Sequence, residues 1–159
     1  MIEYVGNIDD FWSKQFADYV LPHKVNVGQR DHFHPNYSQT SAEILQAFDN
    51  EVPCKEQFMS AVGAQIGSIS LICLEPGQII PVHKDSFYKL RQDHNVDIGD
   101  CIRYLIFLQD WEMGHFVEFR ETCITKWNKG DVWKFDSVSE HYAVNASQIN
   151  FVTCQVNTF

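Results

Sequence analysis

Residues 76–87 read Pro-Gly-Gln-Ile-Ile-Pro-Val-His-Lys-Asp-Ser-Phe, and this stretch is the strongest indication of both fold and function. The Pro-Gly pair predicts a turn, and the apolar runs on either side of it, Ile69–Leu74 and Ile79–Val82, predict two short strands. His83 and Asp85 then follow two residues apart. Side chains at this spacing point to the same face of an extended strand, so we expect the imidazole and the carboxylate to converge.

A second imidazole is expected from His141, which lies in the stretch Ser-Glu-His-Tyr-Ala-Val-Asn near the end of the sequence. Two histidines and one carboxylate form the facial set of ligands that leaves coordination positions open on iron(II) in non-haem oxygenases. In a chain with seven histidines and 21 acidic residues, an H-x-D can also arise without any role. The position of this one, after a strand and a turn and before further strands, favours a metal site at His83, Asp85 and His141.

The composition excludes several classes of function. The 159 residues are 45% hydrophobic, which suits a single globular domain, 1–159, with its own core. A formal net charge of −9 without a block of lysine or arginine argues against nucleic-acid binding. We expect no membrane span and no secretion signal. The five dispersed cysteines are expected to be reduced and buried, as in a cytoplasmic protein.

The first 67 residues predict helices that support a β core. A helix is expected to begin at Phe11 behind an aspartate cap and to end at Pro22. A capping box at Thr40–Glu43 predicts a second helix that reaches about Asp49, and the apolar spacing over 58–62 predicts a third.

The polar stretch between the first two helices, His23–Gln39, predicts a loop. His32 and His34 form an H-x-H motif within it, which is a conceivable metal site. Because the surrounding residues are polar and unpatterned, we expect these two histidines to be solvated loop residues rather than ligands.

From residue 68 onward the pattern changes to short apolar runs separated by turn residues. We expect strands at Ile69–Leu74, Ile79–Lys84, Cys101–Gln109, His115–Arg120, Thr122–Trp127, Val132–Phe135, His141–Val144 and Ile149–Val156. The connection 86–100 is expected to be a long polar loop. The predicted fold is therefore mainly β with N-terminal helices: a jelly roll, or cupin-like double-stranded β-helix, over about 68–159 with helical support over about 1–67.

Four of these segments together resemble the iron(II)- and 2-oxoglutarate-dependent dioxygenases, in particular the prolyl-hydroxylase-like and aspartyl/asparaginyl-hydroxylase-like members, including compact bacterial and phage forms. They are PGQIIPVHKD, IRYLIFLQDW, KGDVWKF and SEHYAVN. The resemblance covers roughly Ile69–Val156. It implies a double-stranded β-helix, iron(II) held by His83, Asp85 and His141, and 2-oxoglutarate and dioxygen as co-substrates. It also implies the cytoplasm of a bacterium or of a phage-infected cell.

The sequence departs from this family at one position. Many members carry an arginine or lysine about ten residues after the distal histidine, where it binds the far carboxylate of 2-oxoglutarate, but here that region reads Asn150-Phe151. Arg103 is the best replacement, because it lies within an apolar strand where a charge is costly without a purpose. Alternation places it on the face of Leu105 that lines the barrel. It can also be a strand-end residue that pairs with Asp97 or Asp100.

Other polar residues have smaller roles in this hypothesis. Lys134 is a second candidate for the co-substrate anchor. Asn145 can orient His141 or bind co-substrate, although it is equally suited to a turn. Lys89 and Arg91 are candidates for contact with the primary substrate.

The resemblance implies hydroxylation of an amino-acid side chain in a peptide or protein, or of a small molecule. A cupin-type metalloenzyme that does not use 2-oxoglutarate is one alternative. A non-catalytic jelly-roll binding module, which needs no metal, is the other. The sequence does not determine the primary substrate or the oligomeric state.

Overall fold

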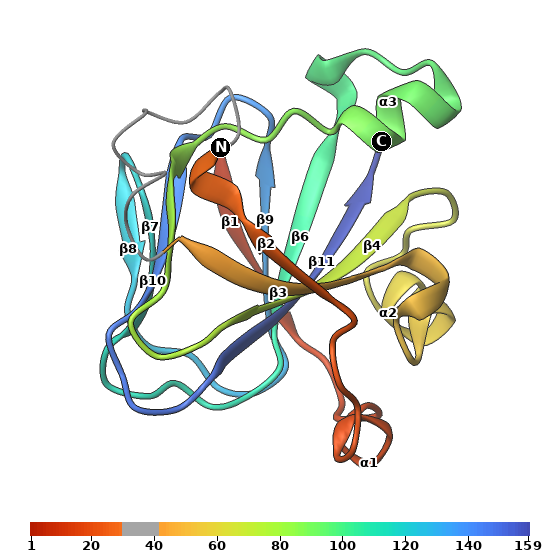
Figure 1. Cartoon of the computed structure of the whole chain (residues 1–159). Helices are drawn as coiled ribbons and strands as arrows, with labels where there is room; N and C mark the ends of the chain where they lie inside the picture. Colours follow the sequence, from red (N-terminus) through yellow and green to blue (C-terminus); the bar gives the residue numbers. More distant parts are fainter. Residues whose placement is uncertain (30–41) are drawn as a thin grey trace.

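Strands form most of the regular secondary structure in a computed structural model that describes residues 1–29 and 42–159 (Figure 1). The strands are β1 (Ile2–Asn7), β2 (His23–Asn26), β3 (Glu43–Phe48), β4 (Ser68–Leu74), β5 (Ile79–His83), β6 (Ile102–Phe107), β7 (His115–Phe119), β8 (Thr122–Ile124), β9 (Asp131–Asp136), β10 (His141–Asn145) and β11 (Phe151–Thr158). The α-helices are α1 (Ser13–Phe16), α2 (Lys55–Ala61) and α3 (Tyr88–His94).

Two antiparallel sheets arise from these strands. Within the described residues, the larger sheet has the order β1-β9-β6-β11-β4-β3-β2 and the smaller has the order β5-β10-β7-β8. From β4 to β11 the chain crosses repeatedly between the two sheets, as it does in a double-stranded β-helix. This crossing makes β5 and β10 hydrogen-bonded neighbours, although they are far apart in the sequence.

The apolar side chains form two main layers. One layer fills the space between the sheets and includes Leu105, Phe107 and Phe151. The other lies on the outer face of the larger sheet, where Trp12 and Phe58 pack against Ile69 and Val156. Figure 1 shows α1 and α2 on this outer side and α3 beside the end of β11. The helices therefore leave the space between the sheets open to a ligand.

The eight strands predicted after residue 67 are all present as β4 to β11, with ends shifted by a few residues. The predicted helix over 58–62 is also present, as α2. The helix expected to begin at Phe11 is present only as the single turn α1. Trp12, the residue directly before this turn, is buried. No described helix has the length and apolar character needed to span a membrane.

The prediction for the N-terminal part was wrong in its main feature. The helix expected to follow Thr40–Glu43 is the strand β3, and residues 40–41 of its capping box lie outside the described residues. The predicted loop that starts at His23 begins with the strand β2, and β1 was missed. All three strands belong to the larger sheet, so this region extends the β structure rather than supporting it with helices alone.

The connection 86–100 also differs from the expected loop. It contains α3 and a turn of 3-10 helix at Ile98–Asp100. Phe87 and Leu90 are buried in it against Cys101. This small apolar cluster closes one side of the space next to the H-x-D motif.

Candidate metal centre

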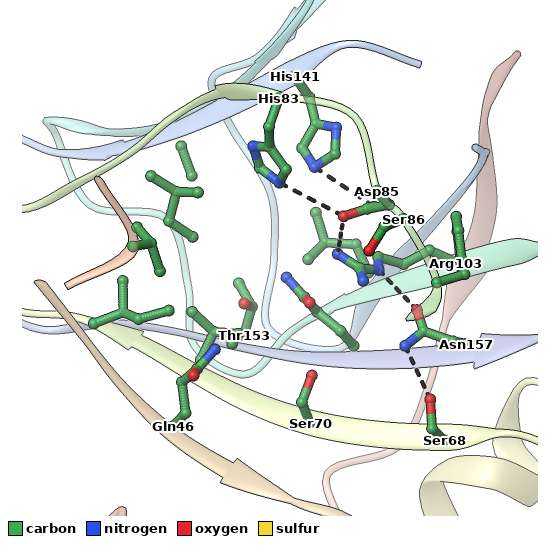
Figure 2. Close-up of a pocket in the computed structure, with 18 of the residues that line it drawn as sticks. Gln46, Ser68, Ser70, His83, Asp85, Ser86, Arg103, His141, Thr153 and Asn157 are labelled. Carbon is green, nitrogen blue, oxygen red and sulfur yellow. Dashed lines mark hydrogen bonds and ion pairs between the residues drawn. The ribbon is translucent and has the colours of Figure 1, made fainter. Parts of the chain in front are cut away.

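His83 and His141 face each other across the pair formed by β5 and β10. Their rings lie 4.3 Å apart, centroid to centroid. Asp85 follows the end of β5, and its side chain is directed at both rings, as Figure 2 shows. The possible ligand atoms of the three residues all lie within 4.8 Å of one another. The convergence predicted from the i, i+2 spacing and the distal histidine is therefore present in the structure.

A β-bulge sets the direction of His83. His141 pairs with His83, but Ala143 pairs with Ile80, so two residues of β5, Pro81 and Val82, lie opposite one residue of β10. A bulge of this kind breaks the alternation of faces along a strand. Because of it, Ile80 and His83 both line the cavity between the sheets, although they are three residues apart.

Backbone carbonyl groups orient both imidazoles. Nδ1 of His83 donates to the carbonyl oxygen of Pro81 at 2.8 Å, and Nδ1 of His141 donates to that of Ser139 at 3.0 Å. A hydrogen bond of this type places the lone pair on Nε2, the tautomer that ligates a metal. Nε2 lies 3.5 Å from Asp85 Oδ1 in His83 and 3.8 Å from Asp85 Oδ2 in His141.

The charge of Asp85 is stabilised by its neighbours. Arg103 donates from Nη1 to Asp85 Oδ1 at 2.7 Å, and both side chains are largely buried. Burial alone raises the pKa of Asp85, but the guanidinium of Arg103 and the two imidazoles outweigh burial and hold that pKa well below its ordinary value. Burial lowers the pKa of His141 to about 4. The carboxylate is therefore ionised and His141 is neutral at neutral pH, as metal ligation requires.

Asp85 Oδ2 is the atom that best fits the role of a metal ligand. It is enclosed, and it has no hydrogen-bond partner among the described residues. Buried polar atoms are nearly always bonded. The oxygen lies on the side of the carboxylate that faces His141, while Oδ1 is held by Arg103. The donor set of two imidazoles and one carboxylate oxygen suits iron(II) with open positions.

Arg103 lies inside the cavity, as alternation predicted, and not at the surface with Asp97 or Asp100. Its Nε donates to Asn157 Oδ1 at 2.8 Å, and Asn157 in turn donates to Ser68 Oγ at 3.1 Å. The guanidinium also lies over the Phe87 ring, 5.5 Å from its centroid. Among the described residues no partner binds Nη2, so part of the guanidinium is available to a ligand in the cavity.

Two predicted anchor residues lie elsewhere. Lys134 does not line the cavity, and its ammonium group lies 3.1 Å from Glu3 on the neighbouring strand β1. The Asn145 amide donates to the carbonyls of Leu74 and Ile149 and accepts from Ser147, so it holds the turn after β10. The geometry therefore does not support Lys134 as the co-substrate anchor or Asn145 as a partner of His141.

The remaining predicted residues have separate positions. Lys89 lines the cavity but forms an ion pair with Asp49 at its rim, and Arg91 is exposed on α3 and does not line the cavity. His32 and His34 lie outside the described residues. All five cysteines are free, and Cys123 is exposed, contrary to the expectation that all are buried.

The cavity that contains the site has a volume of about 370 Å³. Its walls are mainly apolar, with Ile44, Leu74 and Val117 among the lining residues. This volume lies within the range of small-molecule sites. The sequence did not point to Gln46, Ser70, Thr153 and Gln155, which also line the cavity. The sequence signal that could have identified them is that each is a polar residue within a strand of mainly apolar residues.

Comparison with known proteins is informative at the level of fold. No protein-family model and no curated protein matches the sequence significantly. Among solved structures, a predicted oxalate decarboxylase from Thermotoga maritima aligns over 88% of this chain and 93% of its own, with a TM-score of 0.50 and 15% identity. The chain has the cupin fold. At this identity the similarity shows nothing further.

Other solved structures align with a smaller part of this chain. A cupin domain from Bordetella pertussis Tohama I aligns over 58% of this chain and 84% of its own, with a TM-score of 0.41 and 15% identity. A structure described as a complex of a non-haem monooxygenase with nickel aligns over 57% of this chain and 42% of its own, with a TM-score of 0.44 and 12% identity. The chemistry of this cupin barrel therefore has to be argued from its own residues.

Proposed function

We propose that this chain is a non-haem iron(II) dioxygenase that uses 2-oxoglutarate as co-substrate and hydroxylates a side chain of a peptide or protein, or a small molecule. The observation that carries the proposal is the convergence of His83, Asp85 and His141 inside a cupin barrel, with Asp85 Oδ2 enclosed and without a hydrogen-bond partner among the described residues. Iron(II) bound to such a set supplies the activation of dioxygen, and the oxidative decarboxylation of 2-oxoglutarate to succinate and carbon dioxide supplies two electrons.

The protein's own residues have distinct roles in this proposal. His83 and His141 would hold the ion through Nε2, because Nδ1 of each ring is bound to a carbonyl oxygen. Asp85 would give one anionic oxygen while Arg103 keeps the other in place. The apolar walls of the cavity would exclude water from the reaction.

Arg103 is the proposed anchor for a carboxylate of 2-oxoglutarate. It lines the same cavity as the three ligands and has N–H groups beyond those bound to Asp85 and Asn157. An arginine that binds a carboxylate inside a low-dielectric pocket forms strong, charge-assisted hydrogen bonds. With Lys134 directed to Glu3, Arg103 is the buried cation of the cavity in the described part of the chain.

An anaerobic titration tests this function. Iron(II) is added to one equivalent and 2-oxoglutarate is then added, and a weak visible charge-transfer band should appear in the wild-type protein. Removing one partner of a buried ionic contact costs about 3–5 kcal/mol, so Arg103→Ala should bind 2-oxoglutarate at least roughly a hundredfold more weakly. Arg91→Ala removes an exposed arginine outside the cavity and should leave the band unchanged.

A cupin-type metalloenzyme that does not use 2-oxoglutarate is the second candidate. The observation in its favour is that Arg103 is already bound to a ligand carboxylate, while β11 contributes no cation to the cavity. In that case iron(II) binds to the wild-type protein but 2-oxoglutarate produces no band at any concentration. A protein that binds no divalent metal at all would instead be a non-catalytic binding module.

A further inference from the structure

The cavity wall opposite the two histidines is a row of polar side chains on the larger sheet. Figure 2 shows Gln46, Thr153 and Ser70 on β3, β11 and β4, across the cavity from His83 and His141. Gln155 also lines the cavity from β11. We refer to Gln46, Ser70, Thr153 and Gln155 as the polar floor.

Strand register explains why these side chains share one face. Gln46 pairs with Ile72, and Ile72 pairs with Thr153, so Gln46 and Thr153 lie in one row across β3, β4 and β11. Ser70 pairs with Gln155 in the next row, two residues along each strand. Because faces repeat every two residues, both rows point into the barrel. A third row, two residues further along, contains Asn157 and Arg103 at the metal end of the wall.

Gln46 is the residue that points to a ligand. It is only 5% exposed, and its Oε1 atom is enclosed without a hydrogen-bond partner in the described part of the chain. Rotating the amide group exchanges oxygen and nitrogen, so either orientation leaves a hydrogen-bonding atom enclosed. Thr153 is 6% exposed and lines the cavity in the same row as Gln46. Buried polar groups without partners are rare and call for an explanation.

Formal charge is confined to the other end and to the rim of the cavity. Arg103 and Asp85 lie beside the metal site. Lys84 and Lys89 are more than half exposed and face Glu140 and Asp49. The polar floor itself has two amides and two hydroxyls and no charge. A carboxylate against this wall would lose its hydration without gaining a counter-charge, whereas a carboxamide both donates and accepts hydrogen bonds there.

We propose that the polar floor is a subsite for the carboxamide end of a small ω-amido acid whose carboxylate end lies at Arg103 and the metal site. The cavity volume of about 370 Å³ accommodates a ligand of this size. Because Arg103 is also the proposed anchor of 2-oxoglutarate, the two ligands would compete for this residue. The proposal concerns a ligand-binding subsite and requires neither 2-oxoglutarate nor dioxygen. It is therefore tested separately from the reaction proposed above.

Matched series of ligands provide the test. Succinamate, glutaramate and adipamate are compared with succinate, glutarate and adipate, which replace the amide by a second carboxylate at the same chain length. Binding is measured by isothermal titration calorimetry on the full chain, with and without zinc(II) as a redox-inert ion. At one chain length at least, the amido acid should bind at least tenfold more tightly than the corresponding diacid, and Gln46→Met should remove that preference.

Controls separate this subsite from general effects of substitution. Gln65→Met makes the same change at an exposed position outside the cavity and should keep the preference. Thr153→Val keeps the shape of the side chain, removes its hydroxyl and should reduce the preference. If thermal unfolding shows that Gln46→Met does not fold, Thr153→Val takes its place in the test. Equal or tighter binding of the diacids at every length overturns the proposal, as does the absence of binding by both series.

Discussion

Replacing Arg103 with methionine should destabilise the metal-free protein and at the same time increase the stabilisation that a metal ion provides. The substitution removes the positive charge that lies 2.7 Å from Asp85 and leaves a carboxylate that is only 6% exposed. Breaking a buried ion pair by removing one partner costs about 3–5 kcal/mol. We expect the lower end, about 3 kcal/mol, because His83 and His141 still face the carboxylate. For a chain of this size that corresponds to a loss of about 6–12 °C in melting temperature.

The assay is thermal unfolding of wild type and variant, each with and without a saturating divalent metal. A bound ion supplies the positive charge that the variant lacks, so the rise in melting temperature on metal addition should be larger in Arg103→Met than in the wild type. Asp85→Asn removes the charge that needs compensation. In that background, Arg103→Met should cost at least about 1 kcal/mol less, which gives the coupling energy of the pair.

Two results would refute this reasoning. If Arg103→Met unfolds within about 0.5 kcal/mol of the wild type, as an ordinary surface substitution does, the ion pair contributes little. If the metal-induced rise in melting temperature is the same in both proteins, Arg103 and the metal do not share Asp85. In the second case the site has to be placed away from Asp85 Oδ2.

Three further outcomes are expected. Asp85→Ala and His141→Ala should each weaken binding of iron(II) strongly, and unchanged affinity measured by titration in both variants would show that the site is misplaced. His32→Ala combined with His34→Ala should retain full iron stoichiometry by metal analysis, and loss of half or more would reveal a second site. Burial lowers the pKa of His115 below its ordinary value of 6.5, so the unfolded chain binds the proton more readily, and the stability that His115 contributes is lost as pH falls below about 6.5. His115→Phe keeps an aromatic ring against Phe151 and should show a shallower decline of unfolding free energy in that range, whereas an identical pH profile would contradict this.

The sequence predicted the second half of the fold well, because its strands have apolar runs of the right length with turn residues between them. It failed at β3, where the capping box at Thr40–Glu43 gave the appearance of a helix start, although the strand is paired on both sides by β2 and β4. Tertiary pairing overrides local preference in such a segment. The strand β1 was missed because it lies at the edge of the sheet and is largely exposed, so its burial pattern is weak.

The convergence of His83, Asp85 and His141 was predictable, because side chains two residues apart on a strand share one face and a further histidine lies on a late strand. Arg103 was predictable because a charge within an apolar strand is unusual. The contact between Arg103 and Asp85 could not be predicted, because it depends on how the two sheets are placed against each other. Lys134 shows the same limit: Arg103 pairs with Phe135, so Lys134 must face the other side of the sheet, but this requires the register of β6 and β9.

The bulge at Pro81 and Val82 makes the length of β5 tolerant of one deletion. His83 pairs with His141 and Ile80 pairs with Ala143, so both β5 side chains face the cavity in spite of their odd spacing. Deleting one of the two bulge residues would place Ile80 and His83 two residues apart, which is the spacing at which regular alternation turns side chains to the same face. A lineage that lost one residue here would therefore keep His83 beside Asp85, whereas the loss of both would turn it to the outer face.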